Sequence, residues 1–211
     1  MGQAHDEAYD LIKKLDPNKP VGISYNTAIF RGLNFFGKIA AAFTHWWFNV
    51  KAATHFEKSD YWGISYYALV LFDPKSITET DRPGKLAELG YRHDKMWAYY
   101  PQGLSEMIMH FHKKYNKPVL ITENGICSNS PLERIESIKD YLKECHTLIS
   151  KGVNLIGYIH WSTFDNFEWH LGNTYQFGLI SVDMKTGKRT VTKAAEFYRD
   201  ICQSNSVNTE A

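Results

Sequence analysis

The stretch PVLITENG, residues 118–125, decides how this sequence is interpreted. It is apolar as far as Ile121, and then Thr122, Glu123 and Asn124 follow before a glycine. A short apolar run that is bounded by a turn signal is typical of a buried strand. The stretch therefore predicts a strand that ends in a glutamate.

Three further apolar runs predict strands in the same way, and helical patterns separate them. The strands are expected in PVGISYN (20–26), YWGISYYALVLF (61–72) and LIGYIHWS (155–162). We expect helices over 4–15, 104–115, 131–152 and 192–202, and one helix or two broken ones over 35–56. The polar stretch 73–85 is expected to be a surface loop.

The alternation of strands and helices predicts the fold class. Short strands that are apolar on both faces and separated by helices indicate parallel βαβ units with right-handed crossovers. The prediction is an α/β architecture with a sheet covered by helices. Four strands fit either a small open sheet or half of a (β/α)₈ TIM barrel, which normally needs about 250 residues.

Composition limits the class of protein. The chain has 211 residues, 44% hydrophobic and 22% charged, with a formal net charge of +1. It is long enough for one globular domain, expected over residues 1–203, with a disordered tail over 204–211. The near-neutral charge argues against nucleic acid, and no apolar stretch is long enough to predict a membrane span.

The cysteines and histidines predict neither disulfides nor a metal site. Three cysteines without metal-type spacing indicate free thiols and a cytoplasmic location. His110 and His112 would point to different faces of a helix, and His160 is expected to pack behind the sheet. We expect no metal and no cofactor.

Polar and aromatic side chains gather where the predicted strands end, which in parallel α/β folds is where chemistry is located. They are Ser65, Tyr66 and Tyr67, then Thr122, Glu123 and Asn124, then Trp161, Ser162, Asp165, Asn166, Glu168 and Trp169. Aromatic faces stack on sugar rings, and carboxylates and amides bind sugar hydroxyls. Each piece alone also fits a turn or a core residue. Together they favour a sugar site.

Long motifs then resemble one family. DYWGISYY, YYPQGL, PVLITENGI, GYIHWSTFDNFEW and FGLISVD are similar, in this order, to the C-terminal half of glycoside hydrolase family 1. The resemblance implies strands 5 to 8 of a (β/α)₈ barrel in a retaining β-glucosidase or β-galactosidase. THWWF further resembles the archaeal-like branch of the family.

The resemblance implies a role for five residues. Glu123 would be the nucleophile that forms a covalent glycosyl-enzyme, and Tyr67 would orient it. Trp161, Glu168 and Trp169 would bind the sugar of a small β-glycoside or oligosaccharide. A carboxylate at Glu168 would repel a 6-phosphate, which implies a sugar without phosphate.

The sequence also departs from the family pattern. Ser65 stands where asparagine is usual, so a polar contact near the nucleophile is expected to be shortened or lost; Asn173 and Gln176 replace a usual tyrosine and arginine. The motif with the acid/base glutamate, T-x-N-E-P, is absent. Glu106 and Glu136 are expected on helices, so neither is a natural substitute.

Three hypotheses follow for function. The chain is a β-glycosidase piece that pairs with a chain carrying the N-terminal half barrel or with a second copy of itself. Alternatively, it is a carbohydrate-binding half barrel without turnover. The third hypothesis is an inactive remnant, truncated relative to the family.

Overall fold

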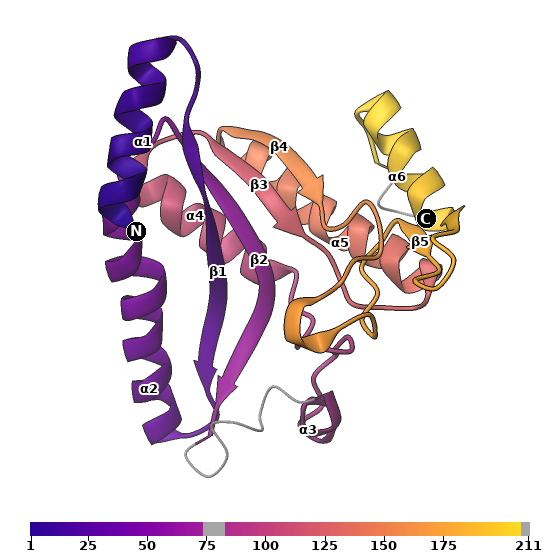
Figure 1. Cartoon of the computed structure of the whole chain (residues 1–211). Coiled ribbons are helices and arrows are strands. Elements are labelled where there is room, and N and C mark those ends of the chain that lie inside the picture. The colour runs from indigo at the N-terminus through magenta and orange to yellow at the C-terminus, as the bar shows by residue number, and fades with distance from the viewer. Residues whose placement is uncertain (74–82, 208–211) are drawn as a thin grey trace.

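The computed structural model describes residues 1–73 and 83–207 and contains a four-stranded parallel sheet (Figure 1). The strands lie in chain order and are β1 (Gly22–Gly32), β2 (Tyr61–Phe72), β3 (Val119–Asn124) and β4 (Leu155–His160). All three neighbouring pairs are parallel. The predicted parallel α/β architecture is therefore confirmed, and β1 is longer than expected because it pairs with β2 over its whole length.

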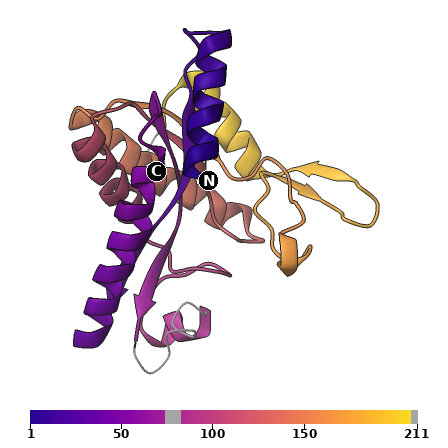
Figure 2. The same cartoon turned by 60° about the vertical axis from the view of Figure 1, so that its left-hand side comes forward.

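The predicted helices are present. They are α1 (Gly2–Leu15), α2 (Phe35–His45), α4 (Gln102–Tyr115), α5 (Pro131–Ser150) and α6 (Lys193–Ser204). The segment predicted as one helix or two broken ones is a single helical run, in which α2 continues through a π-helical stretch (Trp46–Lys51) and a 3₁₀ stretch (Ala52–Phe56). The strands β5 (Ile180–Val182) and β6 (Arg189–Val191) form an antiparallel hairpin, which projects from the body of the chain in Figure 2.

Two expectations reach beyond the described residues. The loop expected over 73–85 lies outside them from residue 74 to 82, and the expectation is wrong at its end, where α3 (Pro83–Glu88) begins. The tail expected over 204–211 lies outside them from residue 208 on, and Ser204 is the last residue of α6. Within the described parts of the chain, no helix is both long and apolar enough to cross a bilayer.

The two faces of the sheet differ, which corrects the expectation of strands that are apolar on both faces. On one face, Trp62, Ile64 and Tyr66 of β2 are buried in an aromatic and aliphatic core with Phe111 of α4. On the other face, Ser24 of β1 donates or accepts a hydrogen bond of 2.7 Å with Thr122 of β3 and is exposed. The hydrophobic burial that stabilises the sheet is therefore on the helix side, and the opposite face carries polar groups.

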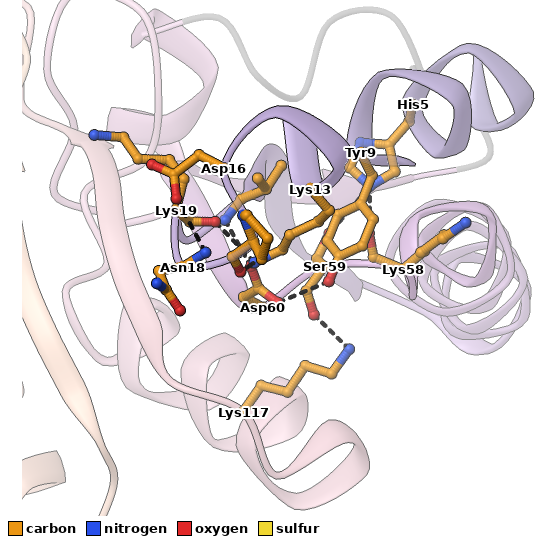
Figure 3. A network of polar contacts seen from close by, with 12 residues as sticks. His5, Tyr9, Lys13, Asp16, Asn18, Lys19, Lys58, Ser59, Asp60 and Lys117 are labelled. Atoms are coloured by element: carbon orange, nitrogen blue, oxygen red, sulfur yellow. Dashed lines mark hydrogen bonds and ion pairs between the residues drawn. The ribbon is translucent and has the colours of Figure 1, made fainter. Parts of the chain in front are cut away.

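Polar contacts hold α1 to the rest of the chain (Figure 3). No residue of α1 is buried. Asp60, just before β2, accepts hydrogen bonds from the Tyr9 hydroxyl and the Val21 N–H, both at 2.8 Å, and lies 2.6 Å from the Lys13 ammonium. The Lys13 ammonium first, and then the Val21 and Tyr9 donors, lower the pKa of Asp60 to about 2.

We predict that Asp60→Asn lowers the free energy of unfolding by about 1–2 kcal/mol near pH 6, because it removes a partly exposed charged acceptor. The difference from the wild-type protein should shrink as the pH falls from about 4 to 2. The carboxyl titrates near 3.9 in the unfolded chain but near 2 in the folded one, so its stabilisation is lost in that interval. Urea unfolding at several pH values measures this.

Asp10→Asn is the matched control, since Asp10 forms an ion pair with Lys58 in which both side chains are more than 40% exposed. Its loss should cost less than about 0.5 kcal/mol. An equal effect of the two substitutions would contradict the role given to Asp60.

Candidate active site

The end of β3 places Glu123 on the polar face of the sheet. Residues up to Ile121 pair regularly with β2, but Ser65 pairs with Glu123 and skips Thr122. Strict alternation would put Glu123 on the same face as Ile121, which is fully buried in the core. The extra residue is a β-bulge, and it turns Glu123 to the face that carries Ser65.

A second bulge lies at Tyr67. In the pairing of β1 with β2, Thr27 is opposite Tyr66 and Ala28 is opposite Ala68, so Tyr67 has no partner on β1. Bulges of this kind re-aim side chains next to functional sites. Here the two bulges bring Tyr67 and Glu123 together.

The Glu123 carboxylate accepts two hydrogen bonds on the same oxygen. The Tyr67 hydroxyl donates to Oε2 over 3.1 Å, and the Ser65 hydroxyl donates to Oε2 over 3.2 Å. Burial first, then the charge of Glu123 and the hydrogen bond to it, and then the charge of Glu168 raise the pKa of Tyr67 well above its usual value. Tyr67 is therefore a hydrogen-bond donor throughout the physiological pH range.

The residues after Glu123 act differently from what the sequence suggested. An Asn-Gly pair commonly turns the chain because both residues tolerate positive φ, but neither Asn124 nor Gly125 has a positive φ. Asn124 is instead buried, where its amide donates to the Tyr66 carbonyl over 2.7 Å and accepts from the Tyr158 hydroxyl over 2.8 Å. A Cβ on Gly125 would lie 2.0 Å from the Trp161 carbonyl oxygen, so the glycine is required by close approach of the backbone.

The sequence did not predict that the aromatic rings of Trp97 and Phe177 pack beside Tyr67. The ring of Trp97 lies 5.2 Å from that of Tyr67 and 6.0 Å from that of Phe177. The half-buried carboxylate of Asp94 fixes Trp97, since it accepts from the Trp97 N–H at 2.7 Å and from the Cys127 N–H at 2.8 Å. Asp94 thus connects the Trp97 loop to the loop that follows Glu123. The Asp-x-x-Trp spacing was the available signal, because an Asp commonly caps a turn in this way.

The predicted sugar-binding residues follow β4. The Trp161 N–H donates to the Asn124 carbonyl at 2.9 Å, which holds the end of β4 against β3. Glu168 accepts a hydrogen bond of 2.6 Å from the Asn166 amide, and its charge acts on Tyr67. The Trp169 side chain is 82% exposed, so the protein leaves its ring available.

Asp165 has a structural place in this loop. It is buried and accepts from the Gly178 N–H at 2.8 Å and the Val182 N–H at 3.1 Å. The structure therefore brings Glu123 and Tyr67 into direct contact, places Glu168 within electrostatic reach of Tyr67, and uses Asp165 to hold the loop in shape.

His160 packs behind the sheet, as predicted. It is buried, its ring lies 5.8 Å from that of Tyr198 in α6, and neither ring nitrogen has a hydrogen-bond partner among the described residues. Burial first, and then the nearby positive charge of Arg134, lower the pKa of His160 to about 3. The imidazole is therefore neutral in the folded protein at neutral pH.

Comparison with known proteins decides the family. The sequence model of glycosyl hydrolase family 1 matches residues 48–207. The chain belongs to glycosyl hydrolase family 1.

Relatives and solved structures agree with this family. The chain is 28% identical to a β-galactosidase of Saccharolobus solfataricus, over 99% of this chain and 48% of the relative. It is 34% identical to β-glucosidase A of Acetivibrio thermocellus, over 64% of this chain and 33% of the relative. It superposes on a Thermotoga maritima β-glucosidase in complex with glucoimidazole with a TM-score of 0.80 and 25% identity, over 98% of this chain and 56% of that one.

The fraction of each relative that this chain covers shows which part of the family 1 fold it forms. The chain spans about half the length of the curated relatives that it matches end to end. A four-stranded parallel sheet with helices that covers about half of family 1 barrels is an α/β half barrel. The sequence left a small open sheet and a half barrel as alternatives, and this coverage selects the half barrel.

At Ser65, the structure excludes one of the two outcomes expected from the departure, which is the loss of the polar contact. The polar contact at Ser65 is present, because the serine hydroxyl reaches Glu123 over 3.2 Å. The bulge in β3 makes this possible, since it puts the shorter side chain directly opposite the carboxylate.

We predict that Gly125→Ala lowers the free energy of unfolding by about 3 kcal/mol, because the new Cβ meets backbone that cannot move away cheaply. Gly157→Ala on β4 is the control. Its Cβ would meet only the Leu120 Cδ1 atom, at 3.0 Å, which is the flexible end of a side chain. Chemical unfolding measures both variants, and equal losses would refute the close-approach explanation.

We also predict that the unfolding free energy falls between about pH 6.5 and pH 3 in part through His160. The unfolded imidazole takes up a proton below about 6.5, whereas the folded one does so only near 3. The contribution is at most about 1.4 kcal/mol per pH unit. His160→Phe should flatten the pH dependence of unfolding over this interval; parallel curves for the two proteins would contradict the assignment.

Proposed function

We propose that this chain carries the nucleophile half of a retaining β-glycosidase that hydrolyses O-glycosidic bonds in small β-glycosides or oligosaccharides. The observation that supports this most is the Glu123 carboxylate at a strand end, held by the Tyr67 hydroxyl at 3.1 Å. Family membership supports the reaction class, and the names of the relatives support glucosides or galactosides as substrates.

In the proposed reaction, the Glu123 anion attacks the anomeric carbon and forms a glycosyl-enzyme, which water then hydrolyses. Tyr67 orients the carboxylate, and its raised pKa keeps it a donor. The exposed ring of Trp169 is available for contact with a sugar, and Trp161 would line the same subsite. Glu168 would accept hydrogen bonds from sugar hydroxyls and repel a phosphorylated sugar.

The acid/base is proposed to come from outside this chain. Glu106 lies on α4 and binds the Arg31 guanidinium at 2.9 Å, and Glu136 lies on α5 and binds Arg92 at 2.8 Å. Both residues lie on helices, as predicted, and both carboxylates are engaged in ion pairs with arginines. A retaining mechanism needs a second carboxyl about 5 Å from the nucleophile.

The sheet offers a place for a partner chain. The outer edge of β1 pairs with no strand among the described residues, and a groove of about 650 Å³ lies beside it, lined by Ile23, Tyr25, Phe48 and Phe56 together with Met1 and Ala4 of α1. Exposed Phe35, Phe36 and Phe43 on α2 add apolar surface. Unpaired edges and apolar patches of this kind attract partners.

A chain carrying the N-terminal half barrel suits this edge better than a second copy does. If β4 of a second copy paired with β1, the α6 helix of that copy would have to cover the outside of the new junction between the two strands. Residues of α1 already line the groove at this place, so α1 and the second copy's α6 would compete for it. The three cysteines are free, which supports a reducing location such as the cytoplasm for the assembly.

We predict that the purified chain is labelled at Glu123 by a 2-deoxy-2-fluoro-β-glycoside with a dinitrophenyl leaving group. Such a leaving group departs without acid assistance, so only the nucleophile is needed. Intact-mass measurement should show the gain of one fluorosugar with the gluco or the galacto probe, and Glu123→Gln should show none.

Binding of the parent sugars without any mass gain would favour the carbohydrate-binding alternative. If the folded protein shows no sugar binding and no labelling, the chain either needs its partner for activity or is an inactive remnant.

A further inference from the structure

Ser65 is fixed at the point where it meets the nucleophile. It lies on β2, is 5% exposed, and is the register partner of Glu123. Its carbonyl oxygen accepts a hydrogen bond of 2.9 Å from the buried Thr27 hydroxyl of β1. The backbone of Ser65 is therefore held by both neighbouring strands, and this fixes the position from which its side chain extends toward Glu123.

The two hydroxyls make the two oxygens of the Glu123 carboxylate inequivalent. Ser65 and Tyr67 both donate to Oε2, at 3.2 and 3.1 Å. Among residues 1–73 and 83–207, no donor forms a hydrogen bond with Oε1. An ionised carboxylate can only accept hydrogen bonds, so two donors on one oxygen fix the rotation of the group about its last bond.

We infer that Ser65 is a positioning residue that, together with Tyr67, holds Oε2 and leaves Oε1 as the attacking atom. This inference rests on the proposed function and deepens it. In the step, a lone pair of Oε1 forms the bond to the anomeric carbon while the bond from that carbon to the leaving oxygen breaks. With a dinitrophenyl glycoside the leaving group departs as the phenolate anion, and no proton is transferred.

One donor would not be sufficient for this positioning. Tyr67 is a long side chain that pivots about two torsions and reaches Oε2 from a bulge. Ser65 reaches the same oxygen from the adjacent strand, directly across the pairing. Ser65 and Tyr67 lie two residues apart on β2, and two donors on Oε2 restrict the orientation of the carboxylate, whereas a single donor leaves it free to rotate.

The test compares the rate of covalent labelling by the dinitrophenyl 2-deoxy-2-fluoro-β-glycoside in wild type, Ser65→Ala and Ser65→Thr. Labelling followed by intact mass against probe concentration gives the limiting rate and the half-saturating concentration separately. Ser65→Ala should lower the limiting rate about 10- to 100-fold, the effect of one hydrogen bond to a charged group. The half-saturating concentration should change less than about 2-fold.

Rescue and a matched control separate positioning from general damage. Ser65→Thr keeps a hydroxyl on a strand residue and should recover most of the limiting rate. Ser24→Ala removes a hydroxyl from the same sheet face, where it bonds Thr122 over 2.7 Å and does not touch Glu123. It should label within about 2-fold of wild type. Equal rates for wild type and Ser65→Ala, or equal losses in Ser65→Ala and Ser24→Ala, would overturn the inference.

Failure of the proposed function has a different signature. If the wild-type chain is not labelled, crystal structures of wild type and Ser65→Ala decide the role of Ser65 without any reaction. The inference expects one carboxylate orientation in wild type and a rotated or divided one in Ser65→Ala. The same single orientation in both crystals would overturn it.

Discussion

The site depends on one register shift in the central sheet. Strand β3 carries one residue more than β2 between Ile121 and Glu123. Without it, the Glu123 carboxylate would point toward the helix layer, where Ile121 is fully buried and a charge is costly. With it, Glu123 faces Ser65 and Tyr67, which donate to its Oε2 atom.

The same sheet separates stability from chemistry. The face toward α4 holds the aromatic core around Trp62 and Phe111, whose ring centroids lie 4.8 Å apart. The opposite face carries the polar groups of the candidate site. Hydrophobic burial on one face can therefore support strand ends whose side chains are polar on the other, and the half barrel keeps the hydrogen bonds around Glu123 formed on its inner strands β2 and β3.

The sequence predicted the parts of this arrangement that depend on pattern. Apolar runs between helical periods gave the four parallel strands, and their polar ends pointed to Glu123 and Tyr67. It could not reveal the bulge, because alternation in ITEN assigns Glu123 to the wrong face. Trp97 was missed because its contact with Tyr67 joins positions 30 residues apart through the Asp94 turn. The reason for Gly125 is a contact with the Trp161 backbone, which no local pattern contains.

Hydrogen–deuterium exchange of the isolated chain tests most directly whether this sheet organises the site by itself. In the structure, β2 and β3 are paired on both sides, whereas β1 and β4 are each paired on one side. The account predicts that the amides of residues 62–66 and 119–121 exchange more slowly than those of either edge strand, without sugar and without a partner chain. Exchange of β3 as fast as an edge strand or faster would contradict it, because Glu123 would then have no fixed register.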